Sequence, residues 1–362
     1  MKKLRIAVLT NCHKEHPSPK DAIFAPGIIA TQIADGLVQR GHSVDMYAPK
    51  GSKTKANLVH FGFKSIYSQY DKKYGLGSSF YTRQFVQADL INITHAIEGL
   101  NSGKYDIIHS HDIRNSVALS CFAKKQIIHT LHTVPQNLTQ FEKYSLRTNK
   151  KNNIFIAISD RQKKLTDKKL FNIIKTIPHG IDIEQFSYNA QPKNYALFVG
   201  RITKEKGAHM AILACKKANI QLILAGNVPS DEASQKYFKE KIEPYLDKNI
   251  KIIGYIKSKQ LAKYYQNAKV LLFPSQVEES FGLAIVEALA CGTPVIATNT
   301  GIASQAIIIG KTGFIESSAD SIAKKIQHIE KIQRKKCAQH AQAHFSLEKM
   351  INEYEQLFKT YA

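Results

Sequence analysis

Two glutamates, Glu279 and Glu287, stand eight positions apart in the stretch KVLLFPSQVEESFGLAIVEALACGTPVIAT. The apolar runs at 270–273 and 294–297 predict strands, and 281–290 contains helix-forming residues with few breakers. We therefore expect a strand–helix–strand unit with Glu279 in the loop and Glu287 within the helix. Carboxylates accept hydrogen bonds from hydroxyl groups, so this pair predicts a site for a ligand that carries diols.

The helix start between the glutamates adds backbone donors to the same site. In a unit of this kind the helix begins at the carboxyl edge of a parallel sheet, so the N–H groups around Phe281, Gly282 and Leu283 face an anion or sugar hydroxyls. Two solvated glutamates favoured by the helix dipole are the alternative. A metal site is the weaker interpretation, because neither glutamate has a neighbouring His or Asp at ligand spacing.

A second group of chemical residues follows the strand expected at 195–199. Arg201 and Lys206 lie in a turn bracketed by Gly200 and Gly207, which matches neither GxxxxGK[ST] nor GxGxxG. Arginine binds phosphate through a planar fork and lysine as a point charge, so the two cations suit a diphosphate. Negative charge on a departing diphosphate would be stabilised without a metal. Ordinary surface cations after a strand are the alternative.

The elements that must position these residues alternate between apolar runs and amphipathic stretches along 362 residues. This alternation predicts an α/β fold of two Rossmann-like, doubly wound domains that face each other across a cleft. The periodicity stops near 183–194 and restarts at Tyr195. We expect three parts: an N-terminal acceptor-side domain at 1–185, a C-terminal nucleotide-sugar-binding domain at 186–345, and a helix at 346–362 that packs across the domain boundary. The ligand classes assigned to the two domains rest on the resemblance described below.

The charge of the chain is strongly positive, at +22 from 51 basic and 29 acidic residues. Between 143 and 175 there are ten Lys or Arg and only two Asp, a local charge of +8. Such a patch suits nucleic acid, an anionic membrane surface or a phosphorylated substrate. A solvated lysine-rich face is the alternative.

Several classes of protein are disfavoured by what the sequence lacks. No apolar run approaches the roughly 18 residues that span a bilayer, and the apolar stretch near the start is too short for a signal peptide. Five scattered cysteines form no CxxC pair, which disfavours a zinc ribbon or a disulfide framework. We expect a cytoplasmic protein, peripheral on the inner membrane face if the basic segment binds lipid.

Four segments resemble the GT-B glycosyltransferases of retaining family 4, also described as glycosyl transferases group 1. They are FVGRITKEKG, EESFGLAIVEALACGTPVIAT, PHGID at 178–182 and GKTGFI at 310–315. The resemblance implies a nucleoside-diphosphate sugar as co-substrate, held by the C-terminal domain, and no metal or other cofactor. It also implies that Arg201 and Lys206 bind the donor phosphates. Glu279, with the backbone of 281–283, would bind the donor sugar, and Glu287 the ribose.

The resemblance extends to the N-terminal domain. Gly27 matches the second glycine of the family's turn near the donor phosphate, with Pro26 in place of the first. His111, at the end of the strand DIIHS, falls where the family has a cleft histidine near the reacting sugar and the acceptor. One departure lies at 300–305, TGIASQ, where relatives often have Gly-Gly followed by Pro-Glu.

Together these features predict a hexosyltransferase of the EC 2.4 class. The resemblance implies retention of anomeric configuration, with His111, Arg201, Lys206 and Glu279 as catalytic residues. It also implies an acceptor that is a sugar, a polyol or a lipid-linked molecule in cell-envelope glycan or glycolipid synthesis. One alternative is a nucleotide-sugar 2-epimerase of the same architecture. Another is a non-catalytic basic protein that binds a surface, and we expect no nucleic acid because no RNP1-type aromatic signature is present.

Overall fold

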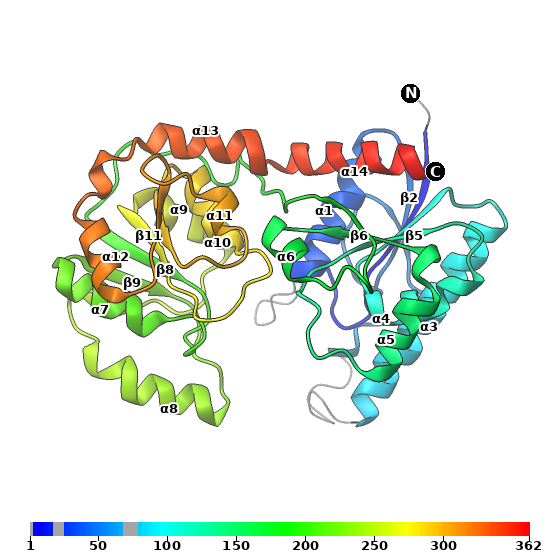
Figure 1. Cartoon of the computed structure of the whole chain (residues 1–362), viewed down its shortest axis with the longest axis horizontal. Helices are drawn as coiled ribbons and strands as arrows, with labels where there is room; N and C mark the ends of the chain where they lie inside the picture. The colour runs from blue at the N-terminus through cyan, green and yellow to red at the C-terminus, as the bar shows by residue number, and fades with distance from the viewer. Residues whose placement is uncertain (1–2, 17–24, 68–78) are drawn as a thin grey trace. The chain divides into compact units, whose positions relative to one another are not determined.

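The computed structural model describes residues 3–16, 25–67 and 79–362. The chain forms two compact units, each with its own sheet (Figure 1). Unit 1 comprises Met1–Ile158, Gln162–Pro178 and Met350–Ala362, and unit 2 comprises Ser159–Arg161 and His179–Lys349. The domain limits expected from the sequence, 1–185, 186–345 and 346–362, stay predictions beside this grouping.

Unit 1 contains a parallel sheet with the strand order β3-β2-β1-β4-β5-β6-β7. The order reverses between β1 and β4, which is where α/β sheets usually bind ligands. The strands are β1 Arg5–Leu9, β2 Ser43–Tyr47, β3 Asn57–Val59, β4 Ile107–Ser110, β5 Ile127–Thr130, β6 Asn153–Ala157 and β7 Ile173–Thr176. The helical segments between them are α1 Ala25–Gln39, α3 Ser79–Asn101, α4 Ile113–Leu119, η1 Ser120–Phe122, α5 Gln140–Thr148, η2 Lys150–Asn152 and α6 Asp160–Leu165.

Unit 2 contains a second parallel sheet with the order β10-β9-β8-β11-β12-β13. Its strands are β8 Tyr195–Val199, β9 Gln221–Ala225, β10 Ile250–Ile252, β11 Val270–Phe273, β12 Val295–Ala297 and β13 Gly313–Ile315. Its helical segments are α7 Ala208–Ala218, α8 Glu232–Lys241, η3 Glu243–Tyr245, α9 Ser258–Asn267, α10 Leu283–Ala290, α11 Ala303–Ala306, α12 Ala319–Ile326, η4 Ile329–Lys331 and α13 Arg334–Phe345.

The central strands of unit 2 are covered on both faces. Every residue of β11 and β12 is buried. Helices α7 and α12 pack against each other, and α10 packs against both α9 and α13 (Figure 1). Burial on both faces explains why these strands are continuous apolar runs rather than alternating patterns. The α/β fold with parallel sheets that the sequence predicts is confirmed.

Two strands expected from the sequence, at Tyr195–Val199 and Val270–Phe273, are present with those limits. The helix expected over 281–290 begins instead at Leu283. Gly282 has φ +101°, in the left-handed region, and therefore precedes the helix rather than belonging to it. The expected start was wrong by two residues because the apolar pattern does not reveal this turn.

The last helix, α14 Leu347–Tyr361, lies within the helix that we expect at 346–362. From Met350 onward its residues belong to unit 1. Ile351 fills the space over Gly36 of α1, where a Cβ would lie 2.1 Å from the Ile351 side chain. The Tyr354 hydroxyl is 2.8 Å from Thr130 Oγ1 at the end of β5. The end of the chain is therefore part of the core of unit 1.

Candidate functional site

Three loops of unit 2 emerge at one edge of its sheet. They follow β8, β11 and β12, which are neighbours in the sheet and run parallel. Because the carboxyl ends of parallel strands meet at the same edge, residues 200–207, 274–282 and 298–302 lie together. Arg201, Lys206 and Glu279, predicted as site residues from segments about 75 positions apart, all belong to these loops.

A glycine draws the first two loops into contact. Gly207 has φ +74°, and a Cβ at this position would lie 2.0 Å from the carbonyl oxygen of Pro274. The Gln276 N–H donates to the Glu205 carbonyl at 2.7 Å. The start of α7 and the end of β11 thus touch through their backbones, which fixes the distance between Lys206 and Glu279.

Lys206 and Glu279 form the centre of the site. The Lys206 Nζ lies 2.5 Å from Glu279 Oε1, and the Ser275 hydroxyl donates to the same oxygen at 2.7 Å. Both charged side chains are half-buried, whereas Ser275 is buried. The cation that the sequence assigns to a phosphate is thus paired here with the carboxylate assigned to the sugar.

Arg201 extends from the same loop as Lys206 but is exposed. Within residues 3–16, 25–67 and 79–362, its guanidinium makes no hydrogen bond or ion pair. Its five N–H groups are therefore available to an anion in the solvent.

The backbone at 281–283 begins α10 beside this cluster. Phe281 is buried, and its carbonyl accepts the Ile302 N–H at 2.7 Å. Gly282 caps the helix, and the Leu283 N–H stands in the first turn, where helices have no internal acceptors. Leu283 is thus the first residue of α10, and Phe281 and Gly282 lie directly before it.

Glu287 lies in the second turn of α10 and is half-buried. Its Oε2 accepts the hydroxyl of Tyr265 on α9 at 2.8 Å. Burial raises the pKa of the Glu287 carboxyl to about 7, although the Tyr265 hydrogen bond lowers it. Glu287 is therefore set in a different environment from Glu279, within the same unit.

The loop after β12, where the sequence departs from its relatives, supports the loop that carries Glu279. Gly301 has φ +54°, and a Cβ there would lie 2.2 Å from the Phe281 carbonyl oxygen. The Gly301 N–H donates to Glu278 Oε1 at 3.2 Å. The segment at 300–305, although it differs from its relatives, therefore has a glycine at the point where its backbone meets that of Phe281.

The remaining predicted residues, Gly27 and His111, belong to unit 1. Gly27 is in the first turn of α1, and a Cβ there would lie 2.0 Å from the ring of His16. His111 directly follows β4, and its Nδ1 is 2.7 Å from Nε2 of His132, with the two rings stacked. Burial lowers the pKa of His132 to about 3, so this ring is neutral and the pair shares one hydrogen bond.

Metal ligands do not gather anywhere in the described part of the chain. No group of three or more His, Cys, Asp or Glu side chains is arranged there to hold an ion. His109 of the HSH motif turns away from such a role, since its Nε2 lies 2.8 Å from Thr130 Oγ1 inside the core.

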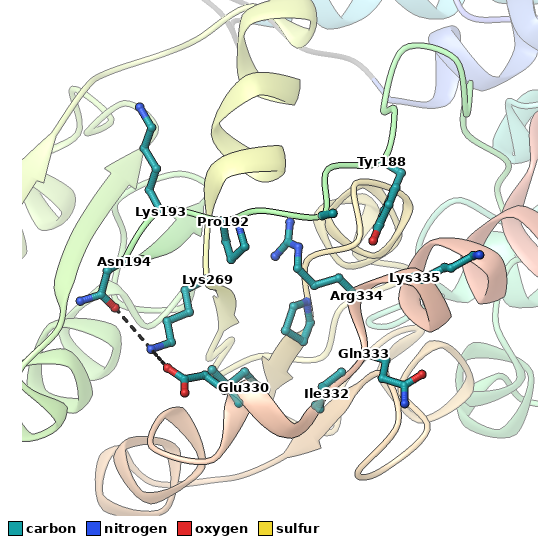
Figure 2. A pocket seen from close by; sticks show the side chains of 13 residues that line it. Tyr188, Pro192, Lys193, Asn194, Lys269, Glu330, Ile332, Gln333, Arg334 and Lys335 are labelled. Atoms are coloured by element: carbon teal, nitrogen blue, oxygen red, sulfur yellow. Dashed lines mark hydrogen bonds and ion pairs between the residues drawn. The ribbon is translucent and has the colours of Figure 1, made fainter.

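A pocket of about 770 Å³ lies at the opposite edge of the unit 2 sheet (Figure 2). Its residues Asn194, Lys269 and Pro294 precede β8, β11 and β12, whereas the predicted site residues follow β8 and β11. Arg334 in this pocket already donates to the carbonyls of Asn189, Gln266 and Ala268 at 2.8 Å each. Figure 2 shows Lys269 directed to Glu330, its ion-pair partner. Arg334 and Lys269 are thus already bound within unit 2.

Two family models match consecutive parts of the chain. The model described as Glycosyltransferase Family 4 matches residues 27–185, and the one described as Glycosyl transferases group 1 matches residues 181–344. The chain belongs to the group 1 glycosyltransferases of family 4.

Individual relatives of this glycosyltransferase are distant. The D-inositol 3-phosphate glycosyltransferase of Arthrobacter sp. (strain FB24) is 29% identical over 248 residues, which cover 59% of each chain. The chain thus spans about three fifths of the length of this relative. Sucrose-phosphate synthase from Thermosynechococcus elongatus superposes with a TM-score of 0.73 at 20% identity, over 99% of both chains. Anabaena HepE in complex with UDP superposes with a TM-score of 0.72 at 15% identity, over 99% of this chain and 100% of that one. The fold is therefore the two-domain α/β GT-B fold.

Some contacts of the candidate site were not anticipated from the sequence. Ser275, Tyr265 and His132 hydrogen-bond to the predicted residues Glu279, Glu287 and His111. The PS dipeptide directly after the strand at 270–273 is the signal that points to Ser275, because small polar residues at a strand's carboxyl end face the site. Tyr265 and His132 contact residues 22 and 21 positions away, and nothing in the local pattern indicates this.

We predict that Gly301→Ala destabilises the protein more than Gly310→Ala. Both glycines have positive φ, which costs an alanine about 1–2 kcal/mol, but nothing lies within 4 Å of a Cβ at Gly310. The clash with Phe281 adds about 1–3 kcal/mol at Gly301. Urea unfolding of both variants measures the difference. Equal loss in the two variants would show that the loops do not pack as described.

Proposed function

We propose that this protein is a retaining hexosyltransferase. It moves a hexosyl group from a nucleoside-diphosphate sugar to an acceptor hydroxyl, and it needs no metal. The observation that carries the proposal is the cluster in which Lys206 and Ser275 converge on one oxygen of Glu279, beside the exposed Arg201. The family membership supports the same conclusion.

The donor site follows from the chemistry of these groups. Arg201 and Lys206 bind the diphosphate and stabilise the negative charge that it gains when the bond to the sugar C1 breaks. Lys206 has three N–H donors, so it serves a phosphate while one of them stays on Glu279. Glu279 accepts from a hydroxyl of the transferred sugar, and Glu287 accepts from the ribose diol.

Bond changes in the transfer balance without another reactant. The C1–oxygen bond to the diphosphate breaks, a bond from C1 to the acceptor oxygen forms, and the acceptor's hydroxyl proton passes to the departing diphosphate. Retention requires attack from the face that the diphosphate leaves. On the acceptor side, the hydrogen bond to His132 fixes the ring of His111, the side chain that we assign to the reacting sugar and acceptor.

We further propose a sugar, polyol or lipid-linked acceptor in cell-envelope synthesis, and docking of unit 1 to anionic lipid. Helix α5 supports docking, since Phe141 and Tyr144 are 74% and 69% exposed one turn apart, next to Lys143 and Arg147. Exposed aromatic rings beside cations suit the headgroup region of a membrane. No helix in residues 3–16, 25–67 or 79–362 is long and apolar enough to span a bilayer.

The basic segment at 143–175 contributes fewer cations to such a surface than its sequence suggests. Arg161 pairs with Glu278, at 2.6 Å from Nη2 to Oε2, and Lys175 pairs with Glu353 at 3.1 Å. Its other eight cations form no ion pair within the part of the chain that the structure describes, although Lys150 Nζ donates to the Lys169 carbonyl at 3.0 Å. Each basic group near an anionic membrane contributes about 1 kcal/mol, so eight are sufficient for salt-dependent binding.

We predict that Arg201→Ala and Glu279→Ala lower donor turnover about 100-fold or more, since each removes a charged contact at the reacting centre. Release of nucleoside diphosphate from UDP-, GDP- and ADP-sugars, with and without simple sugars and polyols, measures this. UDP-glucose is the first donor to assay, because Anabaena HepE has been crystallised with it. Lys204→Ala, an exposed cation in the same loop, is the control and keeps full turnover.

Unchanged turnover in both Arg201→Ala and Glu279→Ala would contradict the site. Loss of activity on chelation of divalent ions would contradict the metal-independent mechanism. Conversion of UDP-N-acetylglucosamine to an epimer without any acceptor would favour the epimerase instead.

We predict that the protein floats with vesicles containing anionic lipid at low salt and is released as salt rises, because screening weakens the contacts of exposed charges. Phe141→Ala combined with Tyr144→Ala reduces flotation several-fold. Tyr255→Ala, an exposed aromatic residue of unit 2, leaves it unchanged. Absence of flotation at low salt would refute membrane docking.

A further inference from the structure

Each glutamate of the site receives a side-chain hydroxyl on only one of its two oxygens. Ser275 donates to Glu279 Oε1 at 2.7 Å, and Tyr265 donates to Glu287 Oε2 at 2.8 Å. The other oxygens, Glu279 Oε2 and Glu287 Oε1, accept no hydrogen bond within the described residues. Neither of these two oxygens is both buried from solvent and without a hydrogen-bond partner, in contrast to some other polar atoms of the described residues. Each carboxylate is thus held on one side and open on the other.

The two hydroxyl donors are themselves fixed. Ser275 is 2% exposed at the end of β11, and its carbonyl accepts the Thr298 hydroxyl at 2.7 Å. Tyr265 is fully buried, its ring meets Phe186 edge-on at 6.1 Å, and its carbonyl accepts the Thr293 hydroxyl at 2.5 Å. The carbonyl oxygens of Val277 and Glu205 are farther from the Ser275 hydroxyl, at 3.2 and 3.4 Å. Ser275 therefore donates its single hydroxyl proton to Glu279.

Fixed donors matter because a glutamate side chain otherwise rotates among several rotamers. When a ligand has to order such a side chain, binding is weakened by the conformational entropy that the side chain loses. A donor that holds one oxygen in advance removes this cost from binding and sets the direction of the other oxygen. Both glutamates would then present one oriented acceptor to a ligand hydroxyl.

We propose that Ser275 and Tyr265 are positioning residues, which aim the open oxygens of Glu279 and Glu287 at a sugar hydroxyl and at the ribose diol respectively. This inference rests on the proposed function. It divides the site into two independent halves, because Ser275 acts only on the sugar end of the donor and Tyr265 only on the nucleoside end.

The protonation of Glu287 supports the role of Tyr265. Burial raises the pKa of Glu287 to about 7, and the Tyr265 hydrogen bond opposes this rise. Burial and the neighbouring Glu287 keep the pKa of Tyr265 well above its ordinary value, so the phenol stays a donor. Because the charged carboxylate is a stronger acceptor for the hydroxyls of a diol than the neutral carboxyl, the affinity for the donor falls as the pH drops below about 7. A nucleotide sugar suits this test, since it lacks the phosphate monoester proton that titrates near pH 6.

Calorimetric titration of the full chain with UDP-glucose and with UDP separates the two halves. Ser275→Ala weakens UDP-glucose binding about 10-fold and leaves UDP binding unchanged. Tyr265→Phe weakens both ligands by a similar factor, about 10-fold, and moves the pH midpoint for UDP-glucose upward. Glu287→Gln removes that midpoint. Tyr264→Phe, the neighbouring half-buried tyrosine, behaves as wild type in every respect.

Three outcomes would overturn the inference. They are equal weakening of both ligands by Ser275→Ala, wild-type binding by both variants, and an unmoved pH midpoint in Tyr265→Phe. A thermal unfolding curve for each variant separates loss of fold from loss of positioning. If the wild-type protein binds none of the UDP-, GDP- or ADP-sugars, the proposed function itself fails. GDP-mannose with GDP, or ADP-glucose with ADP, replaces the UDP pair if the protein prefers that base.

Discussion

The convergence of Lys206 and Ser275 on one oxygen of Glu279 is the interaction on which the site depends. It joins the loop after β8 to the loop after β11, and both loops are held by backbone contact at Gly207 and Pro274. Without the ion pair, Lys206 would be a solvated surface cation. Without the glycine, the two loops could not approach closely enough for the pair to form.

The parallel topology of the unit 2 sheet brings the loops of the site together. Strands β8, β11 and β12 are neighbours although they come from distant parts of the sequence, so their carboxyl ends deliver three loops to one edge. The third loop adds Gly301, which packs against the Phe281 carbonyl and supports the start of α10. The opposite edge carries a pocket of about 770 Å³ around Arg334, but its guanidinium is already satisfied by backbone carbonyls.

Local patterns predict the strands at Tyr195–Val199 and Val270–Phe273 and a helix at 346–362, observed over Leu347–Tyr361, because burial on both faces and amphipathic periodicity act within each element. The start of α10 was misplaced because a left-handed glycine follows from tertiary contacts. The hydrogen bond between Tyr265 and Glu287 could not be predicted from local patterns either, because it joins side chains of two different helices. The sequence also overstated the basic segment, because the partners of Arg161 and Lys175 lie far along the chain.

A crystal structure of the protein with an intact nucleotide sugar tests the central claim most directly. We predict that the diphosphate lies within hydrogen-bond distance of Arg201 and Lys206, with a sugar hydroxyl on Glu279 and the ribose on Glu287. A nucleotide bound at the Arg334 edge of the sheet, or a diphosphate that touches neither cation, would contradict it.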